Sequence, residues 1–317
     1  MLFFLLMGIL PMVLGSEDAV GMTRALQVLI KDGYNPSWII DGGANVGKWS
    51  QGIQKVFPDS SILMLDANDR HKEVLTGVRD QFRQAHPSSH YDFKIGLLGD
   101  EDGRNVTFYT RTEKLFTTGD SMFIENTKAY SNTLHNKYKE VVQPMRTVDT
   151  LFRDFRRAAG DPASMGSDSV GLLKLDIQGG EMGALVGAAE VLKQTPVVVC
   201  ELSVSQMNSG APLMFETLVV LRRFGFILYD ITDIVRWGRG AIQVDAIFVH
   251  KDATYWDKEK TGLPRPETPP ASLELRHIYQ QSLHELWRES KADTVAKISA
   301  GKVKQAGTNK KARRSRR

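Results

Sequence analysis

The stretch "IIDGGANVGKWS", residues 39–50, decides the fold class because an apolar run ends in a glycine-rich turn and an amphipathic segment follows. Its spacing is compatible with three kinds of ligand. A phosphate-binding P-loop requires Ser or Thr directly after the lysine, whereas Trp49 follows Lys48 here. A dinucleotide-binding turn is hindered by Ala44, which crowds the approach of a pyrophosphate, and by Asp41, which repels phosphate.

The third interpretation is the order acid-x-Gly-x-Asn-x-Gly, which is close to the first motif of S-adenosylmethionine enzymes. S-adenosylmethionine has no phosphate and carries a positive charge on its methionine half, so a carboxylate at Asp41 suits it. Gly43 and Gly47 let the backbone approach the ligand, and Asn45 tolerates a left-handed backbone. We therefore predict that Asp41, Gly43, Asn45 and Gly47 bind S-adenosylmethionine; the alternative is a tight turn without a ligand.

The composition is that of a globular protein with one large domain and appendages. The 317 residues are 42% hydrophobic and 25% charged. The single cysteine, Cys200, excludes an intrachain disulfide and a cysteine-cluster zinc site. Because Cys200 stands in the apolar run "VVVCEL", we predict a buried structural thiol rather than a nucleophile.

The net charge of +4 comes from the C-terminal tail. Residues 301–317 carry eight Lys and Arg and no acid, so residues 1–300 carry a net charge of −4. Such a segment is typical of a disordered, solvated tail. It is also suited to contact an anionic membrane or another polyanion, and a nuclear import receptor is a further candidate. No specific nucleic-acid recognition is predicted.

The first fifteen residues, "MLFFLLMGILPMVLG", contain no charged side chain. This length is short for a membrane span and typical of the apolar region of a signal peptide, with small residues before Ser16 at a possible cleavage site. A basic flank is missing, while Glu17 and Asp18 follow. We predict entry into the secretory pathway, by a cleaved leader or a short anchor; the alternative is a cytoplasmic protein with a buried N-terminal helix.

Apolar runs of strand length alternate with segments of helical periodicity between residues 37 and 250. The predicted strands are 37–42, 61–67, 91–99, 105–110, the first part of 140–152, 170–177, 196–202, 225–231 and 241–250. The predicted helices are 48–57, 69–85, one from Asp149, 181–192, 212–224 and one near 271–290. This alternation predicts a doubly wound, Rossmann-like α/β fold whose ligand binds beyond the carboxyl ends of the strands.

Acidic residues end four of these strands, beginning with Asp41. Asp66 ends the second strand, nineteen residues after Gly47, where a carboxylate is well placed to accept hydrogen bonds from both ribose hydroxyls of a nucleoside. We therefore predict that Asp66 binds the cofactor. Acids after one or two strands are ordinary, because they cap the following helix, but four at one edge favour a functional site.

The turn "LDIQGGE", residues 175–181, places Asp176, Gln178 and Glu181 together, and Glu201 ends the next strand. We predict Asp176, Glu181 and Glu201 as catalytic residues and Gln178 as a contact of the substrate. His135, in a polar segment, is a further substrate-binding candidate, with a simply exposed histidine as the alternative. The histidines are scattered and no His-Glu-x-x-His occurs, so no metal site is predicted.

Five segments together resemble the FkbM-type methyltransferases over a range from about Thr23 to His250. They are "WIIDGGANVGKWS", "LMLDAN", "MRTVDTL", "LLKLDIQGGEMGALVGAAEVL" and "IQVDAIFVH". The most specific parts are Lys-x-Asp-x-x-Gly-x-Glu at 174–181 and Gln-x-Asp at 243–245. Two positions depart from the family pattern, because Asp66 and Gln178 stand where the family usually has Glu.

The resemblance implies a class I methyltransferase, with a mostly parallel seven-stranded sheet whose last strand runs antiparallel. It implies S-adenosylmethionine as cofactor and O-methylation of a hydroxyl on a sugar, a glycan or a small metabolite. We accordingly expect a leader or anchor over 1–15, a methyltransferase domain over 22–257, a helical appendage over 258–300 and a disordered basic tail over 301–317.

Methyl transfer to an unactivated hydroxyl requires alignment of the oxygen with the carbon–sulfur bond and removal of a proton. Asp176 and Glu181 are the first candidates for the base or for positioning the acceptor, and burial would raise the pKa of either. Two alternatives stay open. One is a non-catalytic binding or scaffold protein with the same fold. The other is a nicotinamide-dependent oxidoreductase, although no Tyr-x-x-x-Lys pair is placed for hydride chemistry.

Overall fold

The computed structural model describes residues 18–112, 119–125, 138–160 and 170–253. All of them belong to the first of two units into which the chain divides, Met1–Pro270. The predicted leader, the helical appendage, the basic tail and His135 lie outside the described residues. Among the helices of the described residues, none combines the length and the apolar composition needed to cross a membrane.

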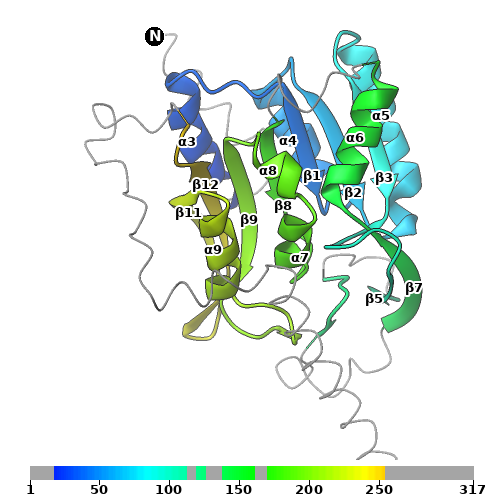
Figure 1. Ribbon diagram of the computed structural model, residues 1–317, viewed down its shortest axis with the longest axis vertical. Coiled ribbons are helices and arrows are strands. Elements are labelled where there is room, and N and C mark those ends of the chain that lie inside the picture. Colours follow the sequence, from blue (N-terminus) through cyan, green and yellow to red (C-terminus); the bar gives the residue numbers. More distant parts are fainter. Residues whose placement is uncertain (1–17, 113–118, 126–137, 161–169, 254–317) are drawn as a thin grey trace, which may run out of the picture. The chain divides into compact units, whose positions relative to one another are not determined.

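A seven-stranded sheet forms the centre of the described fold (Figure 1). Its strands, in spatial order, are β11 (Phe226–Trp237), β12 (Gly240–His250), β9 (Val197–Ser203), β8 (Val170–Leu175), β1 (Trp38–Gly42), β2 (Ser61–Asp66) and β3 (Tyr91–Ile95). The last strand, β12, runs antiparallel to both of its neighbours, and the other pairings are parallel. The predicted fold class is therefore confirmed.

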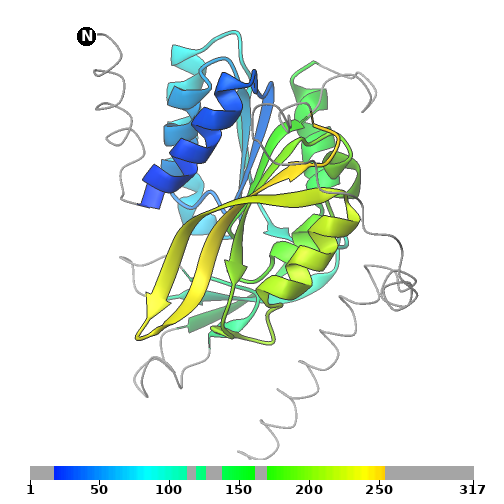
Figure 2. The same ribbon diagram turned by 90° about the vertical axis from the view of Figure 1, so that its left-hand side faces the viewer.

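Helices cover both faces of this sheet (Figure 2). One face carries α3 (Asp18–Lys31), α4 (Lys48–Val56) and α5 (Lys72–Ala85), and the other carries α6 (Val148–Ala158), α7 (Glu181–Val186), α8 (Ala189–Leu192) and α9 (Met214–Arg223). The core beneath the first group joins apolar side chains of its three helices to those of the central strands, as the periodicity requires. β1 and β2 are buried along their whole length, so neither shows the alternation of a half-exposed strand.

An insertion between β3 and α6 builds a second layer at the carboxyl edge of the sheet. β4 (Leu97–Leu98), β7 (Tyr138–Arg146) and β5 (Asn105–Arg111) form a small sheet, and β6 (Ile124–Glu125) pairs with β10 (Asn208–Ser209). Figure 1 shows β5 and β7 at the end of the domain toward which the central strands run. This insertion divides the predicted strand 91–99 into β3 and β4.

The predicted helix over 181–192 is also divided, into α7 and α8. A Cβ at Gly187 would lie 2.0 Å from the carbonyl oxygen of Gly99, so the backbones approach too closely there for a side chain. Asp149 does not begin α6, which follows the cap Thr147. Its carboxylate instead accepts hydrogen bonds from the first amides of α8, those of Glu190 and Val191.

Candidate active site

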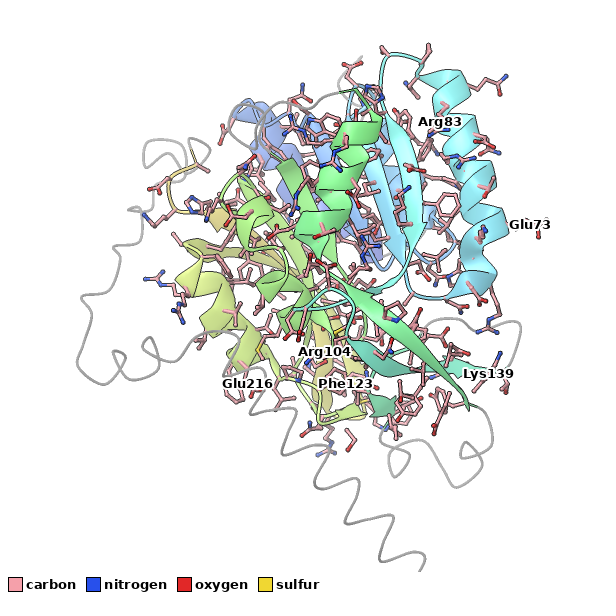
Figure 3. The ribbon with its side chains drawn as sticks, turned by 45° about the vertical axis from the view of Figure 1, so that its right-hand side comes forward. Glu73, Arg83, Arg104, Phe123, Lys139 and Glu216 are labelled. Carbon is pink, nitrogen blue, oxygen red and sulfur yellow. The ribbon has the colours of Figure 1, made fainter. Side chains whose placement is uncertain are left out.

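A cavity of about 400 Å³ lies at the carboxyl edge, between the strand ends and the insertion. Its lining includes six of the predicted site residues: Gly43, Asn45, Asp66, Asp176, Gln178 and Glu201. Figure 3 shows Phe123 and Arg104 at this end of the domain, whereas Arg83 lies at the other end. The cavity is within the usual range of small-molecule sites, roughly 300–1,000 Å³.

The glycine-rich turn joins β1 to the neighbouring strands through its backbone. Gly43 has φ +81°, and a Cβ on it would lie 1.8 Å from the carbonyl oxygen of Asp176. Its amide and that of Ala44 both donate to the carbonyl oxygen of Leu65. Asn45 also has a positive φ, 51°, as its residue type allows. The turn therefore brings β2 and β8 to the same wall of the cavity.

Gly47 is not part of that wall. It has φ +76° at the start of α4, and a Cβ there would meet the side chains of Val78 and Leu75 on α5. A glycine is required at this position because of the positive φ of the turn and because α4 and α5 pack closely there. The described structure does not bring Gly47 to the ligand cavity.

Asp66 holds the turn as well as lining the cavity. Its Oδ2 accepts from the Asn45 amide at 2.7 Å, and its Oδ1 accepts from the Asn68 amide at 2.8 Å and lies 2.9 Å from Nδ1 of His71. A carboxylate has about four acceptor positions, so three are in use. The remaining position, on Oδ2, can accept from one ribose hydroxyl, whereas the sequence pattern predicted that Asp66 accepts from both.

Asp41 lies beneath the turn rather than in the cavity, and its exposed fraction is 0%. Its carboxylate accepts from the Ser50 hydroxyl at 2.7 Å and lies 3.1 Å from the ammonium of Lys174. Lys174 therefore neutralises this charge inside the protein. The expected direct contact of Asp41 with the cofactor is not possible in this arrangement, because burial and the ion pair engage the carboxylate.

Lys174 connects three parts of the site. Besides pairing with Asp41, its ammonium donates to the Gly43 carbonyl at 3.1 Å and lies 3.5 Å from the Asp176 carboxylate. These carboxylates raise the pKa of Lys174 although burial alone would lower it. The cation thus keeps the glycine-rich turn and the "LDIQGGE" turn together.

Asp176, Gln178 and Glu201 meet in the cavity as predicted. The Gln178 amide nitrogen donates to Glu201 at 2.8 Å and to Asp176 at 3.3 Å. Gln178 has φ +57°, and its carbonyl oxygen accepts from Asn208 and Ser121. A left-handed residue that is not glycine costs about 1–3 kcal/mol, and such strain gathers at functional sites.

The electrostatics of this group set Glu201 apart. Burial and the nearby carboxylates of Asp176, Glu181 and Asp245 raise the pKa of Glu201 well above its ordinary value. Asp176 is more accessible, with a side chain 42% exposed, and faces the Lys174 cation. Glu201, a half-buried residue of the lining, therefore retains its proton to a higher pH than an ordinary carboxyl group, whereas Asp176 is open to the cavity.

Glu181, in contrast, faces away from the cavity. Its carboxylate accepts from the amides of Ile177 and Gly179, at 2.8 and 3.1 Å, and its residue is 5% exposed. It closes the turn before α7 as a cap. Burial raises the pKa of Glu181 to about 7. Glu181 therefore cannot touch a substrate, because its side chain is turned into the protein to satisfy these amides.

Sequence reasoning did not find the residues that the insertion supplies. Arg111 donates to Glu125 at 2.9 Å, and its amide donates to Asp120 at 2.7 Å. These three residues line the cavity, and burial raises the pKa of Asp120. Their segment is polar and lacks periodicity, so no pattern marked them.

Four other polar residues of the lining were also unassigned: Asn68, His71, Asn208 and Gln243. Gln243 belongs to the Gln-x-Asp motif, which was a usable signal. Asn68 and His71 follow Asp66 within five residues, so proximity along the chain was a second usable signal.

The sheet with one antiparallel strand, the glycine-rich turn and the acids around one cavity are the features of the class I S-adenosylmethionine-dependent methyltransferase fold. The model of the methyltransferase FkbM domain matches residues 41–228. The chain therefore belongs to the FkbM methyltransferase family, which confirms the predicted family and its cofactor, S-adenosylmethionine.

Solved structures of methyltransferases were also found to be similar. The methyltransferase FkbM from Methylobacillus flagellatus KT is 15% identical with a TM-score of 0.40, and the match covers 67% of this chain and 43% of that one. Magnesium protoporphyrin IX methyltransferase from Synechocystis PCC 6803, solved with bound SAM, is 5% identical with a TM-score of 0.39, covering 74% and 79%. The chain thus spans less than half of the first structure's length. No curated protein matches significantly.

Proposed function

We propose that this protein transfers the methyl group of S-adenosylmethionine to a hydroxyl of a sugar, a glycan or a small metabolite. The observation that carries the proposal is the single cavity that joins Asp66 and the glycine-rich turn to the Asp176–Gln178–Glu201 group. The first part suits a nucleoside and the second suits a hydroxyl that loses a proton.

The residues of the cavity fit the proposed cofactor. Gly43 and Asn45 bring backbone without bulky side chains to the wall, and Asp66 retains one acceptor position for a ribose hydroxyl. The carboxylate of Asp176 supplies negative charge for the cationic methionine half, a role that the sequence pattern predicted for Asp41. S-adenosylmethionine supplies an electrophilic methyl group when it is bound.

We assign Glu201 as the base and Asp176 as the group that positions the acceptor. Once ionised, a carboxylate with a raised pKa is a stronger base than an ordinary one, which favours removal of a hydroxyl proton. The Gln178 amide holds both carboxyl groups, so it orients them relative to the acceptor. This assignment differs from the prediction made from the sequence pattern, in which Glu181 came before Glu201 as a candidate base.

The polar character of this end of the cavity supports a hydroxyl-rich acceptor. Asn208 and Gln243 line it beside the two acids, and amide side chains both donate and accept hydrogen bonds. A sugar presents hydroxyls that do the same. Met122 and Met207 complete the lining with apolar surface, which suits the carbon faces of a sugar ring or of a small metabolite.

The test is calorimetry followed by a transfer assay. Wild-type protein titrated with S-adenosylmethionine and separately with NAD should bind only the former. Methyl-labelled S-adenosylmethionine with a metabolite extract should then yield a product labelled on oxygen. Glu201→Gln should lower turnover by about a hundredfold with cofactor affinity retained. Asp176→Asn should lower turnover and also weaken cofactor binding, because it removes the negative charge proposed to face the methionine half.

Three outcomes would contradict the proposal. Binding of NAD instead would indicate an oxidoreductase. Binding of S-adenosylmethionine without transfer to any extract or glycan fraction would indicate a binding protein. Label on nitrogen or carbon would refute O-methylation.

A further inference from the structure

His71 is one of the residues that line the cavity, and its imidazole contacts Asp66. His71 ends the short 3-10 helix η1 (Asp69–His71) and directly precedes α5, and it is 5% exposed. Its Nδ1 lies 2.9 Å from Oδ1 of Asp66. Its Nε2 is buried and has no hydrogen-bond partner among the described residues.

The contact with Asp66 defines the role of each ring nitrogen. An ionised carboxylate only accepts hydrogen bonds, so Nδ1 carries the hydrogen and donates it to Asp66. In the neutral ring, Nε2 is then left as an acceptor. A buried acceptor without a partner is unfavourable, by about 1–3 kcal/mol, unless a ligand supplies the donor.

The ring is held in place before any ligand arrives. Asp66 is fixed by the amides of Asn45 and Asn68, and the His71 amide donates to the Asn68 carbonyl at 3.1 Å. The Asn68 side chain in turn donates to Asp120 at 2.6 Å. Nε2 therefore has a defined position, as a recognition group requires.

Asp66 cannot bind the whole ribose diol by itself. Its Oδ1 already has two partners and its Oδ2 has one, so a single acceptor position remains for two hydroxyls. The ring of His71 contacts that carboxylate through Nδ1, its Nε2 is an acceptor without a partner among the described residues, and His71 is one of the residues that line the cavity. Nε2 of His71 is therefore available to accept a second hydrogen bond from the nucleoside half.

We propose that Nε2 of His71 accepts a hydrogen bond from the nucleoside half of S-adenosylmethionine, so that Asp66 and His71 bind the nucleoside as a pair. The donor is a ribose hydroxyl or the 6-amino group of adenine. The inference rests on the proposed function in that it takes S-adenosylmethionine as the cofactor.

Two substitutions separate this role from a purely structural one. In His71→Asn, the side-chain amide reaches the position of Nδ1, so it can still donate to Asp66 but offers nothing at Nε2. In His71→Gln, the amide reaches the position of Nε2 and loses the short contact with Asp66. His90→Asn is the control, because His90 is exposed immediately before β3 and is not among the residues that line the cavity.

The measurement is calorimetric titration with S-adenosylhomocysteine, together with the shift in melting temperature that it causes. We expect His71→Asn to weaken binding about tenfold, the scale of one hydrogen bond. His71→Gln should retain more affinity than His71→Asn, and His90→Asn should bind like the wild type. Near wild-type affinity in His71→Asn with a large loss in His71→Gln would overturn the proposal, because only the contact with Asp66 would then matter.

Two kinds of analogue identify the donor. The first lacks the 2′-hydroxyl or, in a parallel compound, the 3′-hydroxyl, and the second carries an oxo group in place of the 6-amino group. The analogue without the relevant donor should bind the wild type more weakly and should lose little further affinity in His71→Asn. If the 2′-deoxy, 3′-deoxy and 6-oxo analogues all lose as much affinity on substitution of His71 by Asn as S-adenosylhomocysteine does, His71 makes no such hydrogen bond. If the wild type does not bind S-adenosylhomocysteine at all, the proposed function itself is wrong.

Discussion

Lys174 shows at the scale of a single residue how the site depends on a buried charge. Its ammonium lies within 3.5 Å of two carboxylates, of which Asp41 is fully buried and Asp176 opens to the cavity. Removing one partner of a buried ion pair leaves an uncompensated charge and costs about 3–5 kcal/mol.

We therefore predict that Lys174→Met lowers the free energy of unfolding by about 3–5 kcal/mol, measured by urea denaturation. The double variant Asp41→Asn with Lys174→Met should recover much of this loss, because the buried charge is gone. Lys94→Met is the control, since Lys94 forms a surface pair with Asp92 and should change stability by less than about 1 kcal/mol. Equal stability of Lys174→Met and wild type would refute the buried pair.

A second prediction at this scale concerns pH and Glu181. Its pKa is raised from 4.5 to about 7 by burial, so the native state holds the proton more tightly than the unfolded chain. The resulting stabilisation is fully present below pH 4.5 and is lost as the pH rises through about 7. The difference corresponds to about 3 kcal/mol.

Urea denaturation of wild type and Glu181→Gln between pH 4 and pH 8 measures this effect. The stability of wild type relative to the variant should fall over that interval, because glutamine does not titrate. Glu190→Gln, at an exposed glutamate of α8, should leave the pH dependence unchanged. A constant difference between wild type and Glu181→Gln would show that the Glu181 carboxyl has the same pKa in the native and unfolded states, which would contradict the prediction.

At the scale of an element, the turn after β1 acts as a joint between strands. Gly43 allows the backbone of β1 to meet that of Asp176, which follows β8, because no side chain intervenes. A helical glycine that has space for a side chain is different, because replacing it by alanine should stabilise the protein. Gly77 lies in α5, and a Cβ there would meet nothing within 4 Å.

We predict that Gly43→Ala destabilises the fold and abolishes measurable binding of S-adenosylhomocysteine, since a Cβ would lie 1.8 Å from a backbone oxygen. Gly77→Ala should instead stabilise the protein by about 0.4–1 kcal/mol, because alanine is the better helix former. Thermal melting and calorimetry of the two variants test the pair. Normal binding by Gly43→Ala would mean that the turn tolerates a shift away from Asp176.

At the scale of the whole molecule, the first fifteen residues and the basic tail lie outside the described residues and stay predictions. We propose that residues 1–15 direct the chain into the secretory pathway, because they form an uncharged apolar run followed by acids. Glycosylation of Asn105 would report entry into the secretory pathway, since "NVT" is a glycosylation sequon and Asn105 is exposed at the start of β5.

Fusion of residues 1–30 to a reporter should therefore give a product protected from added protease in opened cells. In the full chain, Asn105→Gln should remove a mass that a glycosidase also removes. The same fusion with charged residues introduced into the apolar run is the control and should stay in the cytosol. A reporter that stays cytosolic, uncleaved and accessible to protease with the native leader would contradict the prediction.

The sequence by itself determined the class of fold, the order of the central strands along the chain, the family and the cofactor. Apolar runs, a glycine-rich turn and strand-end acids are local signals, and each depends on neighbours within a few residues. Cys200 is an example, because an apolar run predicted its burial and the structure confirms it. Most helix and strand positions followed from the same patterns to within a few residues.

Only the tertiary structure decided which strand-end acids reach the cavity. Asp41 and Asp66 end adjacent strands, yet one is buried against Lys174 and the other faces the cavity. Glu181 was diverted in the same way, because the amides of its turn needed an acceptor. Asp120 and Glu125 reach the site through the insertion, whose pairings join residues far apart in the chain. Such choices depend on which distant partner neutralises each buried charge or amide, and that is a property of packing rather than of local sequence.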